Sequence, residues 1–521
     1  MLLKLTKFFT YVSLFAVLVV LTGAFFPFIG GKAYFFRIAV EVAAAFALLW
    51  WAFESAPREA GHLLRGAFRK PLVVAVSVFA LAFLLAALFA DNPYAAFWSN
   101  YERGEGGFQM LHYYAFFMLL ALFFKEARDW ERFFKVAVLA ALLMVLYGAG
   151  SAVLNVSPAG APSNPFGFVS VYVGPDGKPI APTFLGRLFS PEVRFQGSLG
   201  NPAYVAPYLM FTMFYCFYLF SRHTKRWWWV AGGVFFFVFL ILTQTRGALI
   251  GTAAAAAVFF LYAIANTEGK SRRTYTILLW ALALLYGALL YYRTSEFVTS
   301  NFPVLERIFG LGLSPSQAGK LWLAAAAALL LLNVFFVAQQ KMRVVAAALF
   351  LALAVGGGWY VRTLKQFPAA DSFATRVWTW GTAVEGFKER PLLGWGPENF
   401  PAVFDRHFDP RHFVPGQGTE TWFDRAHSVL FDYLAETGLV GLLAYLAIFI
   451  TFFREFARRV RASAERVLSR ALVVALPVGY LVQAFALFDV LPVYINLFLF
   501  LAFASWWLSL GAQAHHGALP A

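Results

Sequence analysis

The chain has 521 residues, of which 61% are hydrophobic and 13% are charged, and its formal net charge at pH 7 is +15. Soluble globular proteins usually contain about 25% charged residues. This composition therefore excludes a soluble enzyme and indicates a polytopic membrane protein. The single cysteine, Cys216, excludes a disulfide within the chain.

Apolar runs of about 20 residues, long enough to cross a bilayer as helices, recur along the whole chain. They predict an all-α polytopic fold with about 14 transmembrane helices (12–14), in which residues 1–521 form a single transmembrane domain. The first run resembles a signal peptide, but no clean cleavage site follows it, so we expect a retained helix. The predicted spans lie near 9–29, 34–53, 71–90, 108–124, 133–154, 202–220, 227–244, 247–265, 274–292, 320–338, 344–361, 428–453, 469–488 and 491–510.

Basic residues in the loops predict the orientation of these spans. Alternate loops are short and rich in lysine and arginine ("RGAFRK", "SRHTKR", "KSRR", "REFARRVRASAER"), which places them and the N-terminus in the cytoplasm. The outer loops are then 91–107, 155–201, 293–319 and 362–427, and the last of these is a large helical loop. The basic inner face suits anionic membrane lipids, so no nucleic-acid partner is expected.

Two outer segments near the N-terminal half carry candidate arginines. Arg103 lies in the polar turn "YERGEGGFQ", which could line an outer cavity. Arg194 precedes "QGSLGNP", in which Asn201 and Pro202 predict a capped helix start. An anion could rest at that helix N-terminus; the alternative is capping and turn chemistry alone.

Arg246 stands in "TQTRGA", a tight outer turn between two apolar runs. An arginine at this depth is costly and tends to be functional, and Gly247 would let a ligand approach the backbone closely. The alternative is an interfacial arginine that extends toward the headgroups.

The segment "FATRVWTWGTAVEGFKERPLLGWGPENF" (373–400) begins with a helical pattern. Val377, Trp380, Val384 and Phe387 recur at steps of three and four residues, which predicts an amphipathic helix on the outer surface. Arg376 lies on this helix, either as a ligand-binding residue or as a solvated one.

The segment "WFDRAHSVLFDYLAETG" (422–438) places ionisable residues at the start of a span. With Asp424 as the N-cap, His427 occupies the third helical position, where the helix dipole disfavours imidazolium. A neutral imidazole suits a general base, and Asp424 is close enough to orient it. Glu436 lies nine residues on, on another face, so we expect a buried, hydrogen-bonded or protonated carboxyl there. Arg425 is a second charged neighbour.

The segment "FDRHFDPRHF" (404–413) contains His407, His412, Asp405 and Asp409. Metal binding there is an alternative, but the spacing matches no established zinc pattern. We therefore expect no metal.

Together, "RVWTWGTAVEGFKERPLLGWGPENF" and "DRAHSVLFDYLAETG" resemble the signature region of the bacterial O-antigen ligase and polymerase superfamily. Members show Arg-x-x-x-Trp, then Pro-Leu-x-Gly-x-Gly-x-x-Asn-Phe, then Ala-His-Asn and Glu-x-Gly. The resemblance covers about 194–445, and Ser428 departs from it where asparagine is usual, which bears on acceptor contacts more than on the base. The matching residues are Arg376, Trp380, Pro391, Leu392, Gly394, Gly396, Asn399, Phe400, Ala426, His427, Glu436 and Gly438.

The resemblance implies a GT-C-like glycosyltransferase of the bacterial inner membrane, with its active site on the periplasmic or exterior face. It would transfer a glycan from a polyprenyl-diphosphate-linked donor to a glycan, lipid or protein acceptor, with inversion and without a metal or other cofactor. Arginine recognises phosphate oxygens through paired hydrogen bonds. The expected site is His427 as the base and Arg194, Arg246 and Arg376 on the diphosphate, supported by Asp424, Arg425, Glu436 and Arg103.

Two kinds of alternative stay open. A polysaccharide polymerase or a protein O-oligosaccharyltransferase would belong to the same superfamily. A transporter or flippase for a lipid-linked or anionic solute would instead need polar groups at the bilayer midplane and broken helices in paired repeats. Glu41 and the glycines 356–358 are the only hints of such a path, and the sequence has no evident repeat.

Overall fold

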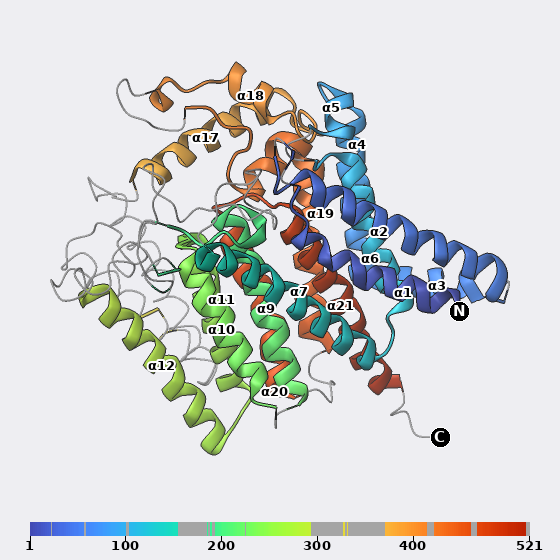
Figure 1. Ribbon diagram of the computed structural model, residues 1–521, viewed down its shortest axis with the longest axis vertical. Helices are drawn as coiled ribbons and strands as arrows, with labels where there is room; N and C mark the ends of the chain where they lie inside the picture. Colours follow the sequence, from blue (N-terminus) through green and yellow to red (C-terminus); the bar gives the residue numbers. More distant parts are fainter. Residues whose placement is uncertain are drawn as a thin grey trace.

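The structure is a computed structural model, and all its regular elements are helices in the part of the chain that it describes (Figure 1). The described residues are 1–21, 23–24, 26–56, 59–100, 104–154, 185, 188–189, 193–223, 226–292, 327–328, 331, 370–413, 421–459 and 466–516. Within them, 8 helices are long and apolar enough to cross a membrane. The protein is therefore an all-α integral membrane protein.

The membrane-length helices and their neighbours follow the predicted spans closely over most of the described chain. Two apolar helices, α6 (Gly107–Phe123) and α10 (Trp228–Leu242), are shorter than the rest. The others are α2 (Gly30–Leu49) with its π-helical end η2 (Trp50–Glu54), α4 (Pro71–Leu88), α7 (Ala127–Leu154), α9 (Pro202–Arg222), α11 (Arg246–Ala265), α12 (Gly269–Tyr292), α19 (Val429–Arg459), α20 (Val467–Ala484) and α21 (Leu491–His516). The predicted spans 320–338 and 344–361 and most of the predicted outer loop 155–201 fall outside the described residues.

The first predicted span, 9–29, is wrong in its bounds. The chain forms α1 (Leu2–Val12), continues as the 3-10 helix η1 (Ser13–Leu18), and becomes extended at Val19. Pro27, which lacks a backbone N–H, lies in the irregular segment that follows. The next helix begins at Gly30.

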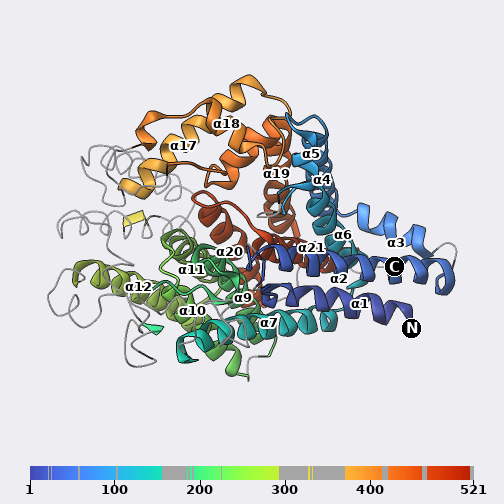
Figure 2. The ribbon, with the colours of Figure 1, turned by 45° about the horizontal axis from the view of Figure 1, so that its top comes forward.

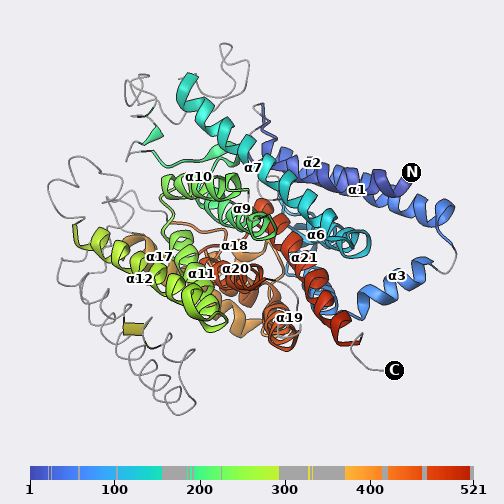
Figure 3. The ribbon, with the colours of Figure 1, turned by 90° about the horizontal axis from the view of Figure 1, so that it is seen from below.

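The bundle is organised around α21. Of the residues in its most apolar stretch, within Leu491–Leu510, 89% are buried. Tyr113 of α6 stacks on Tyr494 of α21 with ring centroids 4.9 Å apart, and Phe214 of α9 meets Phe500 of α21 at 5.6 Å. Seen from below, α9 and α20 also lie in the middle, with α12 at one edge and α3 (Glu59–Phe68) at the opposite edge (Figure 3).

A layer of one long helix and several short elements covers one end of the bundle, at the top of Figure 1 and turned toward the viewer in Figure 2. It contains α17 (Ala370–Glu389), α18 (Phe400–Arg406) and η4 (Pro410–His412), and α5 (Pro93–Trp98) lies at its side. Trp380 of α17 stacks on Phe431 at 5.0 Å and meets Phe485 at 5.2 Å, which fixes the layer to α19 and α20. The predicted stripe on α17 is partly wrong, since Val377 is 44% exposed, whereas Ala383, which the prediction did not include, is buried in the same cluster as Trp380.

The helix α19 is broken at Gly438, which adopts φ 61° and ψ −163°. The loop 391–396 lies against this break, and four backbone hydrogen bonds of 2.8–3.1 Å join it to residues 435–440. Backbone groups at membrane depth need such partners, because lipid supplies none. The four bonds run from Trp395 N to Ala435 O, Gly396 N to Glu436 O, Leu439 N to Pro391 O and Val440 N to Leu392 O.

Candidate functional site

Three arginines that lie far apart in the sequence line one cavity of about 320 Å³. Arg194 comes from the segment before α9, Arg246 is the first residue of α11, and Arg376 lies on α17. The lining also includes Ala203, Gln244, Thr245, Gly247, Ala248, Gln483, Ala486 and Leu487, so the described wall holds no carboxylate. Such a cavity has a strongly positive potential and is suited to a polyvalent anion.

The turn between α10 and α11 positions two of these arginines. Gln244 has a positive φ of 51°, which reverses the chain so that α11 starts at Arg246. Arg194 donates from Nε to Thr243 O at 2.9 Å and from Nη2 to Thr245 Oγ1 at 3.0 Å. The turn therefore holds the guanidinium of Arg194 at the same wall of the cavity as Arg246.

Helix N-termini add to the positive potential of the cavity. Residues 245–248, the first turn of α11, belong to its wall. The first N–H groups of a helix have no partner within the helix and carry partial positive charge, so they favour an anion. At α9 the N-cap is Asn201, whose side chain accepts from Ala203 N at 2.8 Å, and Pro202 follows it, as the sequence predicts.

Close packing of α11 on α20 shapes another part of the cavity wall. A Cβ at Gly251 would lie 2.5 Å from Gly479 O and 3.0 Å from the Cβ of Gln483. A Cβ at Gly247 would lie 3.9 Å from Ala486. The absence of a side chain at Gly251 lets α20 approach, whereas Gly247 has room for a Cβ. This approach brings the completely buried Gln483 to the arginine cavity.

His427 lies beside this cavity, in the segment that precedes α19. Its ring is held edge-on between Phe423 and Phe488, with centroids 5.2 and 5.1 Å away. Val429 donates to Leu487 O at 3.2 Å, and Leu487 lines the cavity. These contacts place the imidazole next to the segment that contributes Leu487 to the cavity wall.

The predicted helix position of His427 is wrong. The helix α19 begins at Val429, so Asp424 is not its N-cap, and His427 adopts a positive φ of 56° just before the helix. Nδ1 of His427 lies 3.2 Å from Arg425 O. A carbonyl can only accept, so this contact assigns the proton of a neutral ring to Nδ1 and leaves Nε2 as an acceptor.

Arg425 is the centre of a buried ionic cluster. It is 8% exposed and pairs with Glu436 Oε2 at 3.1 Å, with Glu105 Oε2 at 3.6 Å and with Glu398. Burial alone would lower the pKa of Arg425, but the surrounding carboxylates raise it well above its ordinary value. Glu436 is 1% exposed and also accepts from Glu398 N at 3.0 Å, so it is the buried, hydrogen-bonded carboxyl that its position suggested.

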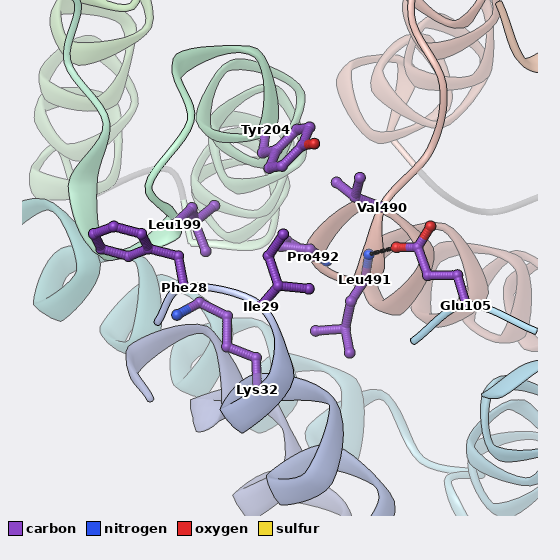
Figure 4. Close-up of a pocket in the computed structure, with 9 residues that line it drawn as sticks. All are labelled: Phe28, Ile29, Lys32, Glu105, Leu199, Tyr204, Val490, Leu491 and Pro492. Carbon is purple, nitrogen blue, oxygen red and sulfur yellow. Dashed lines mark hydrogen bonds between the residues drawn. The ribbon is translucent and has the colours of Figure 1, made fainter. Parts of the chain in front are cut away.

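Glu105 extends this cluster to α21. Its Oε1 accepts from Leu491 N at 2.9 Å, beside a small cavity that Lys32 also lines (Figure 4). That cavity has a volume of about 20 Å³, which is enough for one water molecule. The arrangement is a structural joint between segments rather than a substrate site, and Arg103 falls outside the described residues.

The ionisable residues of 404–413 do not converge on one point. Asp409 accepts from Arg411, and Asp405 accepts from Trp422 at 2.9 Å. His412 is 1% exposed and packs among Phe404, Phe408 and Phe423. The described residues contain no group of three or more histidine, cysteine or acidic side chains placed to hold a metal ion.

Two buried residues of this region are absent from the sequence-based candidates. Gln483 interrupts the apolar span "VVALPVGYLVQAF", and a lone polar residue at such a position is a usable indication of function. Glu398 lies in "GWGPENF" and gives no local indication, because only the fold brings it to Arg425.

Comparison with known proteins agrees with this geometry. Residues 307–446 match a family model described as O-antigen ligase. The matched range contains Arg376, the loop 391–396, His427 and the break at Gly438, whereas Arg194 and Arg246 lie before it. The search of curated proteins gave no match. The matched segment supports a relationship between this chain and the O-antigen ligase and polymerase superfamily of membrane proteins.

Proposed function

We propose that this protein transfers a glycan from a polyprenyl-diphosphate-linked donor to an acceptor hydroxyl, as an O-antigen ligase-like inverting glycosyltransferase. The observation that carries the proposal is the cavity in which Arg194, Arg246 and Arg376 meet the first turn of α11. A lipid diphosphate is a polyvalent anion tethered to the bilayer, and this cavity lies in a membrane protein. Fixed guanidinium groups would supply the charge stabilisation that a metal gives in other transferases.

In the reaction, the acceptor oxygen attacks the anomeric carbon of the donor sugar from the side opposite the diphosphate. The new glycosidic bond forms as the bond to the diphosphate oxygen breaks, and the lipid diphosphate leaves as an anion held by the arginines. Nε2 of His427, the nitrogen that is not protonated, takes the proton of the acceptor hydroxyl. Arg425, Glu436 and Asp424 act at a distance, through the position of the segment that carries His427.

The site faces the periplasm or the exterior in this proposal, with the N-terminus in the cytoplasm. The elements α17, α18 and the start of α19 lie together at one end of the bundle. The basic segments "SRHTKR" and "KSRR", which are typical of cytoplasmic loops, belong to other loops, and this supports an outer position for that end. A GT-C-like fold and a periplasmic site in a bacterial inner membrane are parts of the same proposal.

A polymerase or a protein O-oligosaccharyltransferase would use the same donor site with another acceptor. The transporter alternative has less support from the described structure. Glu41 is 55% exposed on its side chain and lies 2.9 Å from His112 Nε2, and the glycines 356–358 fall outside the described residues. The cavity with three arginines therefore favours the transferase.

The decisive experiment measures transfer and donor binding for the same purified variants. His427→Ala should keep the donor affinity while transfer falls by about 10²–10⁴-fold, the usual contribution of a general base. The matched control is His62→Ala, which changes an exposed histidine on α3. A His427→Ala protein that still transfers within a few fold of native would remove the base from the mechanism.

Arg246→Lys tests the anion site separately. Lysine offers a point charge instead of a planar fork of donors, so this variant should lose most donor affinity although the net charge is unchanged. Near-native affinity would show that charge alone is sufficient.

A further inference from the structure

Gln483 is the one polar side chain of the arginine cavity that is both fully buried and, within the described part of the chain, without a hydrogen-bond partner. Its exposure is 0%, and neither its Nε2 nor its Oε1 has a partner in the protein. The two other buried glutamines differ from it. Gln109 accepts from Arg37 Nε at 2.6 Å, and Gln244 donates to Val193 O at 3.3 Å.

An unsatisfied buried amide is unfavourable, and native proteins rarely keep one without a reason. A structural reason for an amide at 483 is not evident, since its neighbour across the seam with α11 is Gly251, which has no side chain to bond it. An apolar side chain of the same length would pack there without losing a hydrogen bond. The amide therefore has the features of a group that is satisfied only when the cavity is occupied.

The hydrogen-bonding groups of the Gln483 amide limit which part of the donor can bind it. The amide presents two N–H donors and one carbonyl acceptor. The lipid chain of the proposed donor offers neither, and an ionised diphosphate offers only acceptors. The sugar attached to the diphosphate carries hydroxyl or acetamido groups, which both donate and accept.

We propose that Gln483 is a specificity-determining residue that hydrogen-bonds the first sugar of the lipid-linked donor, next to the diphosphate held by the arginines. This inference rests on the proposed function and goes beyond it, because it assigns a separate contact to the sugar. Arg246 on α11 and Gln483 on α20 both line the cavity, and these two helices are in direct contact at Gly251, so the two contacts can lie side by side. The arginines then bind every polyprenyl diphosphate, and Gln483 distinguishes a sugar-bearing one.

The test compares two lipids in nanodiscs: undecaprenyl diphosphate, and undecaprenyl diphosphate that carries one N-acetylhexosamine. Gln483→Met removes both hydrogen-bonding functions and keeps the length of the side chain. It should weaken binding of the sugar-bearing lipid by about 5- to 30-fold and leave the bare lipid within about twofold. Its thermal unfolding without ligand should match or exceed that of the native protein, because no internal hydrogen bond is lost.

The outcomes separate this inference from the proposed function. Equal losses for both lipids would show that Gln483 contacts phosphate, and unchanged affinities would show no contact; either result overturns the sugar contact. Arg246→Ala, measured in parallel, should weaken both lipids alike. If native protein binds neither lipid, or if Arg246→Ala changes neither affinity, the proposed function itself fails. Gln483→Leu serves as the second variant if the methionine protein does not fold.

Discussion

Replacing Arg425 by methionine should destabilise the protein far more than removing any one of the carboxylates around it. One guanidinium faces Glu105, Glu398 and Glu436, and all four side chains are at most 9% exposed. These carboxylates come from the turn before α6, the loop after 391–396 and α19. Arg425 is therefore the only charge of its sign among the described members of this cluster.

The expected magnitude follows from this imbalance. Removing one partner of a buried ion pair costs about 3–5 kcal/mol, since the other charge stays buried without compensation. Arg425→Met leaves three such carboxylates, so the loss should reach at least the upper end of that range. Glu436→Gln leaves Arg425 with two carboxylates and keeps a side chain that can accept from Glu398 N, so its cost should be about 1–2 kcal/mol.

The measurement is the free energy of unfolding in mixed micelles, by titration with a denaturing detergent. The control is Arg411→Met, which removes a 65% exposed arginine paired with Asp409. Exposed pairs contribute about 0–1 kcal/mol. A loss below about 1 kcal/mol for Arg425→Met, or a larger loss for Glu436→Gln than for Arg425→Met, would refute the role assigned to the arginine.

Three further predictions concern the broken helix, the orientation and a buried histidine. Gly438→Ala should cost at least about 1–3 kcal/mol of unfolding free energy, because its φ and ψ are open almost only to glycine and a Cβ would lie 2.5 Å from Leu392 O; an unchanged unfolding midpoint would contradict this. In a Cys216→Ala background, an impermeant thiol reagent should label Val377→Cys but not Arg458→Cys in intact cells, and the reverse pattern would move the site to the cytoplasm. Burial lowers the pKa of His412 below its ordinary 6.5, so the unfolded state binds more protons and stability should fall as pH drops below about 6.5; His412→Phe should reduce that dependence in a pH series of unfolding temperatures.

Local rules predicted the elements whose cause is local. The cap at Asn201, the start of α11 next to Arg246 and the helix over Arg376 all follow from neighbouring residues. The apolar runs likewise predicted most described helices, because a helix that crosses a bilayer needs a continuous apolar segment. The bounds of the first span were wrong, because the helix ends at Leu18 within an apolar run that contains no local stop signal at that position.

Features that depend on distant residues could not be predicted in the same way. One example is the start of α19 at Val429 instead of near Asp424. Ala426 N donates to the carboxylate of Asp432 at 2.6 Å. The preceding residue, Arg425, is held by ion pairs with Glu398 and Glu105, which come from distant segments. The family resemblance predicted that Arg194, Arg246 and Arg376 bind one diphosphate, and all three line one cavity. Spacing along the chain alone could not show this, because the three segments meet only in the fold.

The same distant contacts explain why the histidine segment can be irregular next to a membrane helix. His427 has a positive φ, which is unfavourable for a non-glycine residue and persists only where its surroundings hold it. Arg425, two residues earlier, is fixed by the ionic cluster, and Val429, two residues later, donates to Leu487 O. The imidazole is thus clamped from both sides against the wall of the arginine cavity. Loosening the cluster would then reduce transfer through the position of His427, while Arg246 and the affinity for the diphosphate would be affected much less.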